Sequence, residues 1–173
     1  MQRTGQAGLK TTVNSASTEP NDPWFTNQPY LKDGPLAHNF LAAWDLVSHI
    51  DRDPVIMVLD SEFLREDAET PFIQGYSFVT AFSEVRGTDY MPTVKLDLLC
   101  GGHGLGVASV IGAITNNNVG LAAGIPDAKM YASRVMSCGT GYLSDSAAAI
   151  KHAAKIATKS SINHEYISTA LKF

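Results

Sequence analysis

The stretch Val55–Ile56–Met57–Val58–Leu59–Asp60–Ser61 decides how this chain is expected to fold. Its five consecutive apolar residues, three of them β-branched, are typical of a short strand that is buried on both faces. Such strands belong to parallel sheets that helices cover on both sides. The run leads directly into Asp60, which the rigid end of the strand holds at the edge of the sheet. The stretch therefore predicts an α/β fold and a candidate functional aspartate.

A second stretch, Gly101–Gly102–His103–Gly104–Leu105–Gly106, places one histidine between glycines. The small and apolar residues 107–114 follow it and predict a helix that is surrounded by protein. Flanking glycines let the backbone and a substrate approach His103 closely. Asp60 or His103 alone is more often structural, but an acid at the end of a strand and a histidine at the start of a helix are the types of residue that make up two thirds of a catalytic triad.

The remaining elements are predicted from hydrophobic spacing and from turn residues. Apolar residues recur every three or four positions over 36–47 and predict a helix, and Ser144 and Asp145 are good caps for a later alanine-rich helix. Strands are expected over 76–81, 93–99 and 129–136, with a flexible turn at 138–141. Strands that alternate with helices predict a three-layer α/β sandwich with a mainly parallel sheet.

Composition limits the function classes. A chain of 173 residues with 45% hydrophobic and 17% charged residues is expected to form one globular domain. A net charge of -4 without a cluster of lysines and arginines argues against nucleic-acid binding, and no apolar run approaches the length of a membrane span. Residues 1–20 are interpreted as a polar, flexible lead without the apolar core of a secretion signal, and residues 158–173 as a polar tail or surface helix.

Taken in order, these pieces resemble the first part of a subtilisin-like serine peptidase, a subtilase. Val58–Leu59–Asp60–Ser61 resembles the aspartate motif of that family, and Gly102–His103–Gly104–Leu105–Gly106–Val107–Ala108 resembles its histidine motif. The match continues in the family order through Asn116–Asn117, Gly120, Pro126, Arg134–Val135–Met136 and Gly139–Thr140–Gly141–Tyr142. The resemblance spans residues 21–157. It implies a truncated subtilisin-like domain, a polypeptide substrate and secretion.

The resemblance also assigns catalytic and substrate-binding roles. His103 would act as the general base, and Asp60 would fix the histidine tautomer and stabilise the imidazolium. Gly139, Thr140 and Gly141 would form the edge along which a substrate pairs by its backbone, although an ordinary glycine-containing turn is an equal alternative. Catalysis of this kind requires no cofactor.

Two structural features are implied by the same resemblance. Asn117 and the backbone carbonyls of Val119 and Leu121 match the family's calcium loop, which Glu69 or Asp67 would complete. A loop without metal is the alternative. Cys100 and Cys138 are expected to form a disulfide, with free thiols or a partner in a missing C-terminal half as alternatives.

The chain departs from the family pattern at several positions. Leu105 and Gly106 replace the threonine and second histidine of the histidine motif, and Glu62 replaces the glycine that normally follows the aspartate by two positions. No Gly-Thr-Ser-Met-Ala-like nucleophile segment and no matching oxyanion asparagine occur before Phe173. We therefore expect the chain alone to be essentially inactive and a complementary C-terminal half to be needed.

Two other functions are considered. The first is a non-catalytic subtilase remnant or binding module. The second is a nucleotide-binding α/β domain, since Gly104–Leu105–Gly106 is part of a near-match to the dinucleotide fingerprint whose last position is Ser109.

Overall fold

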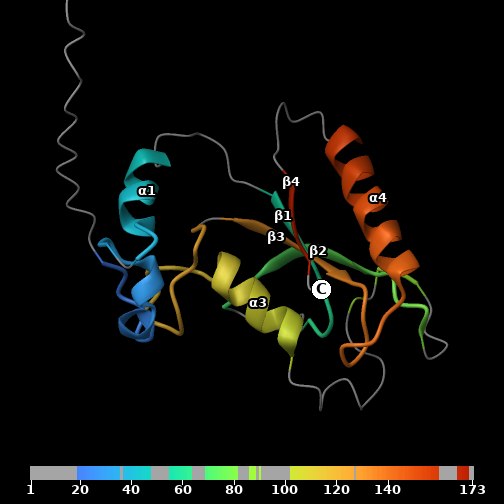
Figure 1. Ribbon diagram of the computed structural model, residues 1–173, viewed down its shortest axis with the longest axis horizontal. Coiled ribbons are helices and arrows are strands. Elements are labelled where there is room, and N and C mark those ends of the chain that lie inside the picture. The colour runs from blue at the N-terminus through green and yellow to red at the C-terminus, as the bar shows by residue number, and fades with distance from the viewer. Residues whose placement is uncertain are drawn as a thin grey trace, which may run out of the picture.

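The computed structural model of the chain describes residues 19–35, 37–47, 55–63, 69–81, 86–88, 90, 102–126, 128–159 and 167–171. Figure 1 shows how the helices and strands of these residues are arranged. The elements are η1 (Phe25–Asn27), η2 (Pro29–Leu31), α1 (Phe40–Val47), β1 (Val55–Asp60), β2 (Phe72–Ser77), α3 (His103–Gly112), β3 (Lys129–Arg134), α4 (Leu143–Lys159) and β4 (Ile167–Leu171).

The four strands form one parallel sheet in the order β2-β3-β1-β4. The predicted buried strand is confirmed, because all six residues of β1 are buried. Asp60 is the last residue of β1 and stands in register with Arg134 of β3. The carboxyl end of the central strand therefore presents the candidate aspartate.

Alternate side chains of β1 enter two separate hydrophobic cores. Ile56 and Val58 pack with Ala108 of α3, whereas Met57 and Leu59 belong to the core that α4 covers. Figure 1 shows α3 and α4 on opposite sides of the sheet. This arrangement confirms the three-layer α/β sandwich, and it explains why β1 is apolar at every position up to Leu59.

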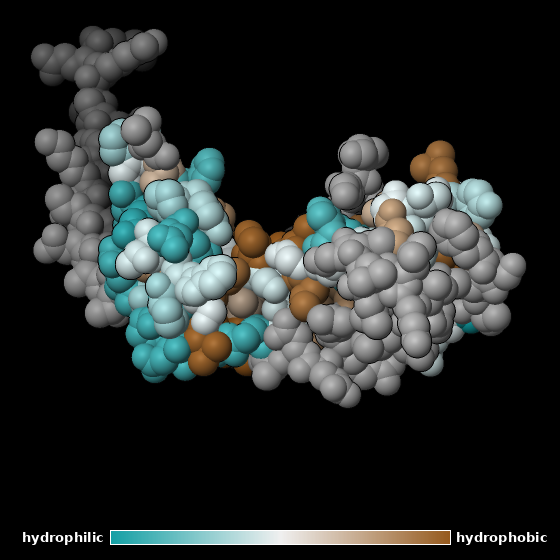
Figure 2. Space-filling model, turned by 90° about the horizontal axis from the view of Figure 1, so that it is seen from below, coloured by the Kyte–Doolittle hydropathy of each residue, from teal (hydrophilic) through white to brown (hydrophobic). Residues whose placement is uncertain are grey.

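The segment before α1 packs onto the loop that follows α3. Phe25 is buried there in a small third core, while Trp24 remains 64% exposed. The buried Asp22 carboxylate accepts hydrogen bonds from the backbone N–H groups of Asn116 at 2.9 Å and Asn117 at 3.2 Å. Figure 2 shows the molecule from below. Hydrophobic residues are exposed in the hollow between the end that carries the N-terminal segment and the opposite end of the molecule.

The strand expected over 76–81 is wrong in its bounds, because β2 spans Phe72–Ser77. Gly75 lies inside this strand. In the structure, the ring of Tyr90 lies where a side chain at Gly75 would stand, so glycine is accommodated inside the strand. The strand expected over 93–99 lies outside the described residues.

Helix ends differ from the expectations as well. α1 begins at Phe40 and α4 begins at Leu143, whereas α3 begins at His103 and ends at Gly112, two residues before the expected end. Asp145 therefore lies within the first turn of α4 and does not precede it as a cap. β3 ends at Arg134, two residues earlier than predicted.

The tail expected over 158–173 requires a correction. α4 continues to Lys159, and Ile167–Leu171 form β4, which pairs with β1 in parallel. This segment becomes a strand because the free edge of β1 offers it backbone partners. Residues 160–166 lie outside the described residues.

Candidate active site

Asp60 lies at the carboxyl end of β1 with its side chain buried. Its Oδ1 accepts hydrogen bonds from the backbone N–H of Ser61 at 2.7 Å, the Ser61 hydroxyl at 3.1 Å and Nδ1 of His103 at 2.8 Å. Three donors therefore converge on one buried oxygen. The sequence interpretation predicted the pairing with His103 and missed the two bonds from Ser61.

His103 is the first residue of α3, and 43% of its side chain is exposed compared with 3% for Asp60. The carboxylate is an acceptor, so the 2.8 Å contact places a hydrogen on Nδ1. Nε2 is then the ring atom that remains able to take up a proton. The pair thus joins a buried carboxylate to an accessible imidazole.

Small residues bring the two groups together. Gly102 precedes α3 with a left-handed φ of 62°. A Cβ on Gly104 would lie only 2.8 Å from the Ser61 carbonyl oxygen, and the Leu105 N–H donates to the Glu62 carbonyl at 3.0 Å. The first turn of α3 therefore packs directly against the backbone that follows β1.

The same packing bears on the nucleotide-binding alternative. That function needs its glycines in a loop before a helix, where a phosphate can approach them. Gly104 and Gly106 instead lie within α3, and Gly104 faces residues 60–62. The structure does not place these glycines as a phosphate loop.

The predicted substrate-binding residues Gly139 and Thr140 lie in a tight hairpin turn. Ser137 and Thr140 exchange two backbone hydrogen bonds of 2.8 Å each. Cys138 and Gly139 both have positive φ, 46° and 75°, as the central residues of a type I′ turn do. Gly141 follows the hairpin and is exposed. The role of these residues in substrate binding stays a prediction.

The hairpin makes a contact that the sequence did not reveal. Oε1 of Glu62 accepts a hydrogen bond from the Cys138 N–H at 2.8 Å. Cys138 is disulfide-bonded. Its predicted partner Cys100 lies outside the described residues, so the Cys100–Cys138 pairing stays a prediction.

The candidate calcium loop lies away from the Asp60–His103 pair, next to the N-terminal segment. Nδ2 of Asn117 donates to the Glu69 carboxylate at 3.3 and 3.2 Å, and Oδ1 of Asn117 accepts from the Val119 N–H at 2.9 Å. Leu121 is partly buried in the same loop, and Asp67 lies outside the described residues. Among the described residues, no group of three or more His, Cys, Asp or Glu side chains is placed to hold a metal ion.

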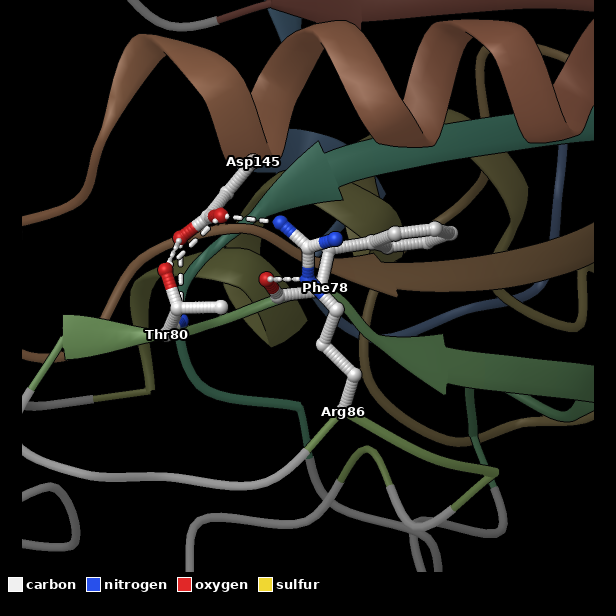
Figure 3. Close-up of polar contacts among 4 residues, drawn as sticks. All are labelled: Phe78, Thr80, Arg86 and Asp145. Carbon is white, nitrogen blue, oxygen red and sulfur yellow. Dashed lines mark hydrogen bonds and ion pairs between the residues drawn. The ribbon is translucent and has the colours of Figure 1, made fainter.

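A polar network around the buried Asp145 fixes the start of α4 (Figure 3). The Asp145 carboxylate accepts hydrogen bonds from the Thr80 N–H at 2.9 Å and the Thr80 hydroxyl at 3.0 Å, and it forms an ion pair with Arg86 at 2.7 Å. Arg86 also donates to the Phe78 carbonyl at 3.1 Å. The network joins α4 to the segment that follows β2.

Tyr131 is a titratable residue whose pKa is shifted. Burial, and secondarily the neighbouring Tyr76, raise the pKa of Tyr131 above its usual value of 10.0. Its hydroxyl lies 3.2 Å from Nε2 of His152, on the face of the sheet that α4 covers.

Known proteins share this arrangement of elements. The model of the subtilase family matches residues 51–165, which extends past residue 157, where the resemblance was expected to end. The chain is 34% identical over 143 residues to the thermophilic serine proteinase of Bacillus sp. (strain AK1), a match that covers 81% of this chain and 32% of that protein. It is 28% identical over 136 residues to thermitase of Thermoactinomyces vulgaris, covering 78% of this chain and 43% of thermitase.

A solved structure of proteases from Pseudoalteromonas arctica matches with a TM-score of 0.63 and 28% identity. The match covers 77% of this chain and 43% of that one. The chain thus spans less than half the length of these relatives. No helix in the described part is long and apolar enough to cross a membrane.

Proposed function

Because the chain belongs to the subtilase family, we propose that His103 is the general base of a site that hydrolyses peptide bonds and that Asp60 is the carboxylate that orients it. The observation that supports this most directly is the 2.8 Å bond between Oδ1 of Asp60 and Nδ1 of His103, which joins residues 43 positions apart. The burial of Asp60 and the exposure of His103 match the orienting and proton-transferring roles.

In the proposed reaction, Nε2 of His103 takes the proton of a serine hydroxyl as its oxygen attacks the peptide carbonyl. The imidazolium then gives this proton to the departing amine, and a water molecule repeats the sequence to release the acyl group. Asp60 keeps the ring oriented and stabilises its positive charge. The 173 residues contain no Gly-Thr-Ser-Met-Ala-like segment, so we assign the nucleophile to a further segment, covalently continuous or separate.

The acid–base pair is testable in the chain as it stands. We expect a strongly deshielded proton resonance from the Nδ1–H of His103, because its acceptor is a buried carboxylate. Asp60→Ala should remove the resonance. A resonance that survives this substitution would show that Asp60 is not the acceptor in solution.

Peptide cleavage is tested by adding a separately produced C-terminal part of a subtilase that carries the Gly-Thr-Ser-Met-Ala segment. Activity should appear only in the mixture. It should fall by about ten-thousand-fold with Asp60→Asn, as it does in serine proteases whose triad aspartate is replaced. His103→Ala is the second control, and activity unaffected by that change would refute the assignment. Peptide binding without cleavage would favour the binding-module alternative.

We further propose that the loop from Asn117 to Leu121 holds a calcium ion together with Glu69. Support comes from the donor types: one carboxylate, one amide oxygen and the backbone carbonyls of Val119 and Leu121 are hard oxygen ligands. The Glu69 carboxylate already lies at this loop, where it accepts hydrogen bonds from Nδ2 of Asn117. Bound calcium would neutralise Glu69 and stabilise the loop on which the N-terminal segment packs.

Secretion is proposed on the same basis. The bonded state of Cys138 fits an oxidising compartment, where disulfides persist. Mass measurement of the peptides of secreted material under non-reducing conditions tests the Cys100–Cys138 pairing, and two free thiols would contradict that pairing.

A further inference from the structure

Glu62 stands where the subtilase pattern has glycine, and only 2% of it is exposed. Burying a carboxylate is costly unless hydrogen bonds or charges compensate it. Here the backbone N–H of Cys138 donates to Oε1 at 2.8 Å, a contact across 76 positions of sequence. A glycine would leave this N–H without its acceptor, so the substitution gives the chain a contact that the family pattern lacks.

Glu62 contacts two other parts of the site. Its backbone carbonyl accepts the Leu105 N–H from the first turn of α3, which begins with His103. In the sequence, Glu62 follows Asp60, the last residue of β1, by two positions. One residue therefore links the strand of the acid, the helix of the base and the hairpin at residues 137–140.

The hairpin needs such support at Cys138. A non-glycine residue with positive φ is intrinsically unfavourable, and Cys138 has a φ of 46°. Cys138 begins a segment that runs to Asp145. The end of this segment is fixed by the Asp145 side chain, which Thr80 and Arg86 hold (Figure 3). Residues 139–144 lie exposed between the two attachments.

We propose that Glu62 is a positioning residue, whose carboxylate holds the hairpin at residues 137–140 at a fixed distance from the Asp60–His103 pair. An extended peptide lying along the hairpin is thereby presented to the base. The presentation of a peptide to His103 rests on the proposed function, whereas the contact by which Glu62 holds the hairpin does not.

The hold is measured by amide hydrogen exchange on the full chain. In Glu62→Ala and Glu62→Gly, exchange at the Cys138 amide should rise by about 10- to 100-fold, the effect of losing one hydrogen bond to a charged acceptor. Glu62→Gln retains an oxygen acceptor and should restore much of the protection. Asp145→Ala is the matched control, since it releases the other end of the segment and should leave the Cys138 amide protected.

Two results would overturn the proposal. One is unchanged exchange at Cys138 in Glu62→Ala. The other is an equal rise at the amides of β1 and β3, because Glu62 would then support the sheet in general.

The consequence for substrate is measured with a blocked alanine pentapeptide, followed by chemical-shift changes at Thr140 and Gly141. Glu62→Ala should weaken its binding about tenfold, and Glu62→Gln should bind nearly as the unchanged chain does. Equal affinity in Glu62→Ala, with faster exchange at Cys138, would refute the positioning role. If the unchanged chain binds no peptide while the exchange effect is present, Glu62 still holds the hairpin and the proposed peptide function fails instead.

Discussion

At the scale of single residues, the absence of a side chain at Gly104 sets how closely α3 approaches the end of β1. A Cβ there would lie 2.8 Å from the Ser61 carbonyl and 3.1 Å from the Asp60 Cβ. Gly106, two residues later in the same helix, has nothing within 4 Å of an added Cβ. Close packing therefore requires glycine at position 104 but not at position 106, although both residues belong to the histidine motif.

Alanine substitutions should separate these two glycines. Gly104→Ala should lower the free energy of unfolding by about 1–3 kcal/mol, because the helix must move away from residues 60–62. Gly106→Ala should raise it by about 0.5–1 kcal/mol, the usual gain in a helix interior. Urea denaturation of both variants checks this, and a destabilised Gly106→Ala variant would contradict it.

At the scale of elements, local pattern predicted some strands and missed others. β1 was predicted because a short apolar run carries its own signal. The bounds of β2 were predicted wrongly because a glycine weakens the local signal for a strand. Gly75 fits inside β2 because it packs against Tyr90, and the neighbouring sequence gives no sign of that contact. β4 was missed because its pairing with β1 makes it a strand.

The same distinction applies to the candidate site. Asp60 and His103 were predicted together because each stands at the end of a recognisable element. The bond from Cys138 to Glu62 was not predicted, because nothing near Glu62 in the sequence indicates a backbone donor 76 positions away. Contacts of side chains with remote backbone groups require the tertiary structure.

The packing of β3 on α4 gives a prediction for pH. The raised pKa of Tyr131 means that the folded chain keeps this proton after the unfolded chain has lost it. The free energy of unfolding should therefore fall as the pH rises above about 10. Tyr131→Phe should flatten this loss, measured as denaturation midpoints from about pH 8 to about pH 11. Parallel curves for the two proteins would contradict it.

At the scale of the whole molecule, the N-terminal segment and the loop after α3 stabilise one another. Asp22 joins them through Asn116 and Asn117. A ligand that binds the folded loop should therefore stabilise more than the loop itself.

Calcium is expected to raise the melting temperature. At about one hundred times its dissociation constant, a ligand that binds only the folded chain contributes about 2.7 kcal/mol. The rise should be abolished by Asn117→Ala and by Glu69→Gln. It should be retained in Asn27→Ala, the control variant, because Asn27 is an exposed residue outside the loop. An equal rise in all four proteins would exclude the proposed site.

The strand order has a consequence for biosynthesis. β1 ends at residue 60, and both of its neighbours in the described sheet, β3 and β4, follow much later in the chain. At ribosomal speeds of about 5–20 residues per second, β3 emerges several seconds after β1. During that interval the apolar run from Val55 to Leu59 has no lateral partner. A chaperone that shields this run would protect the nascent polypeptide from aggregation.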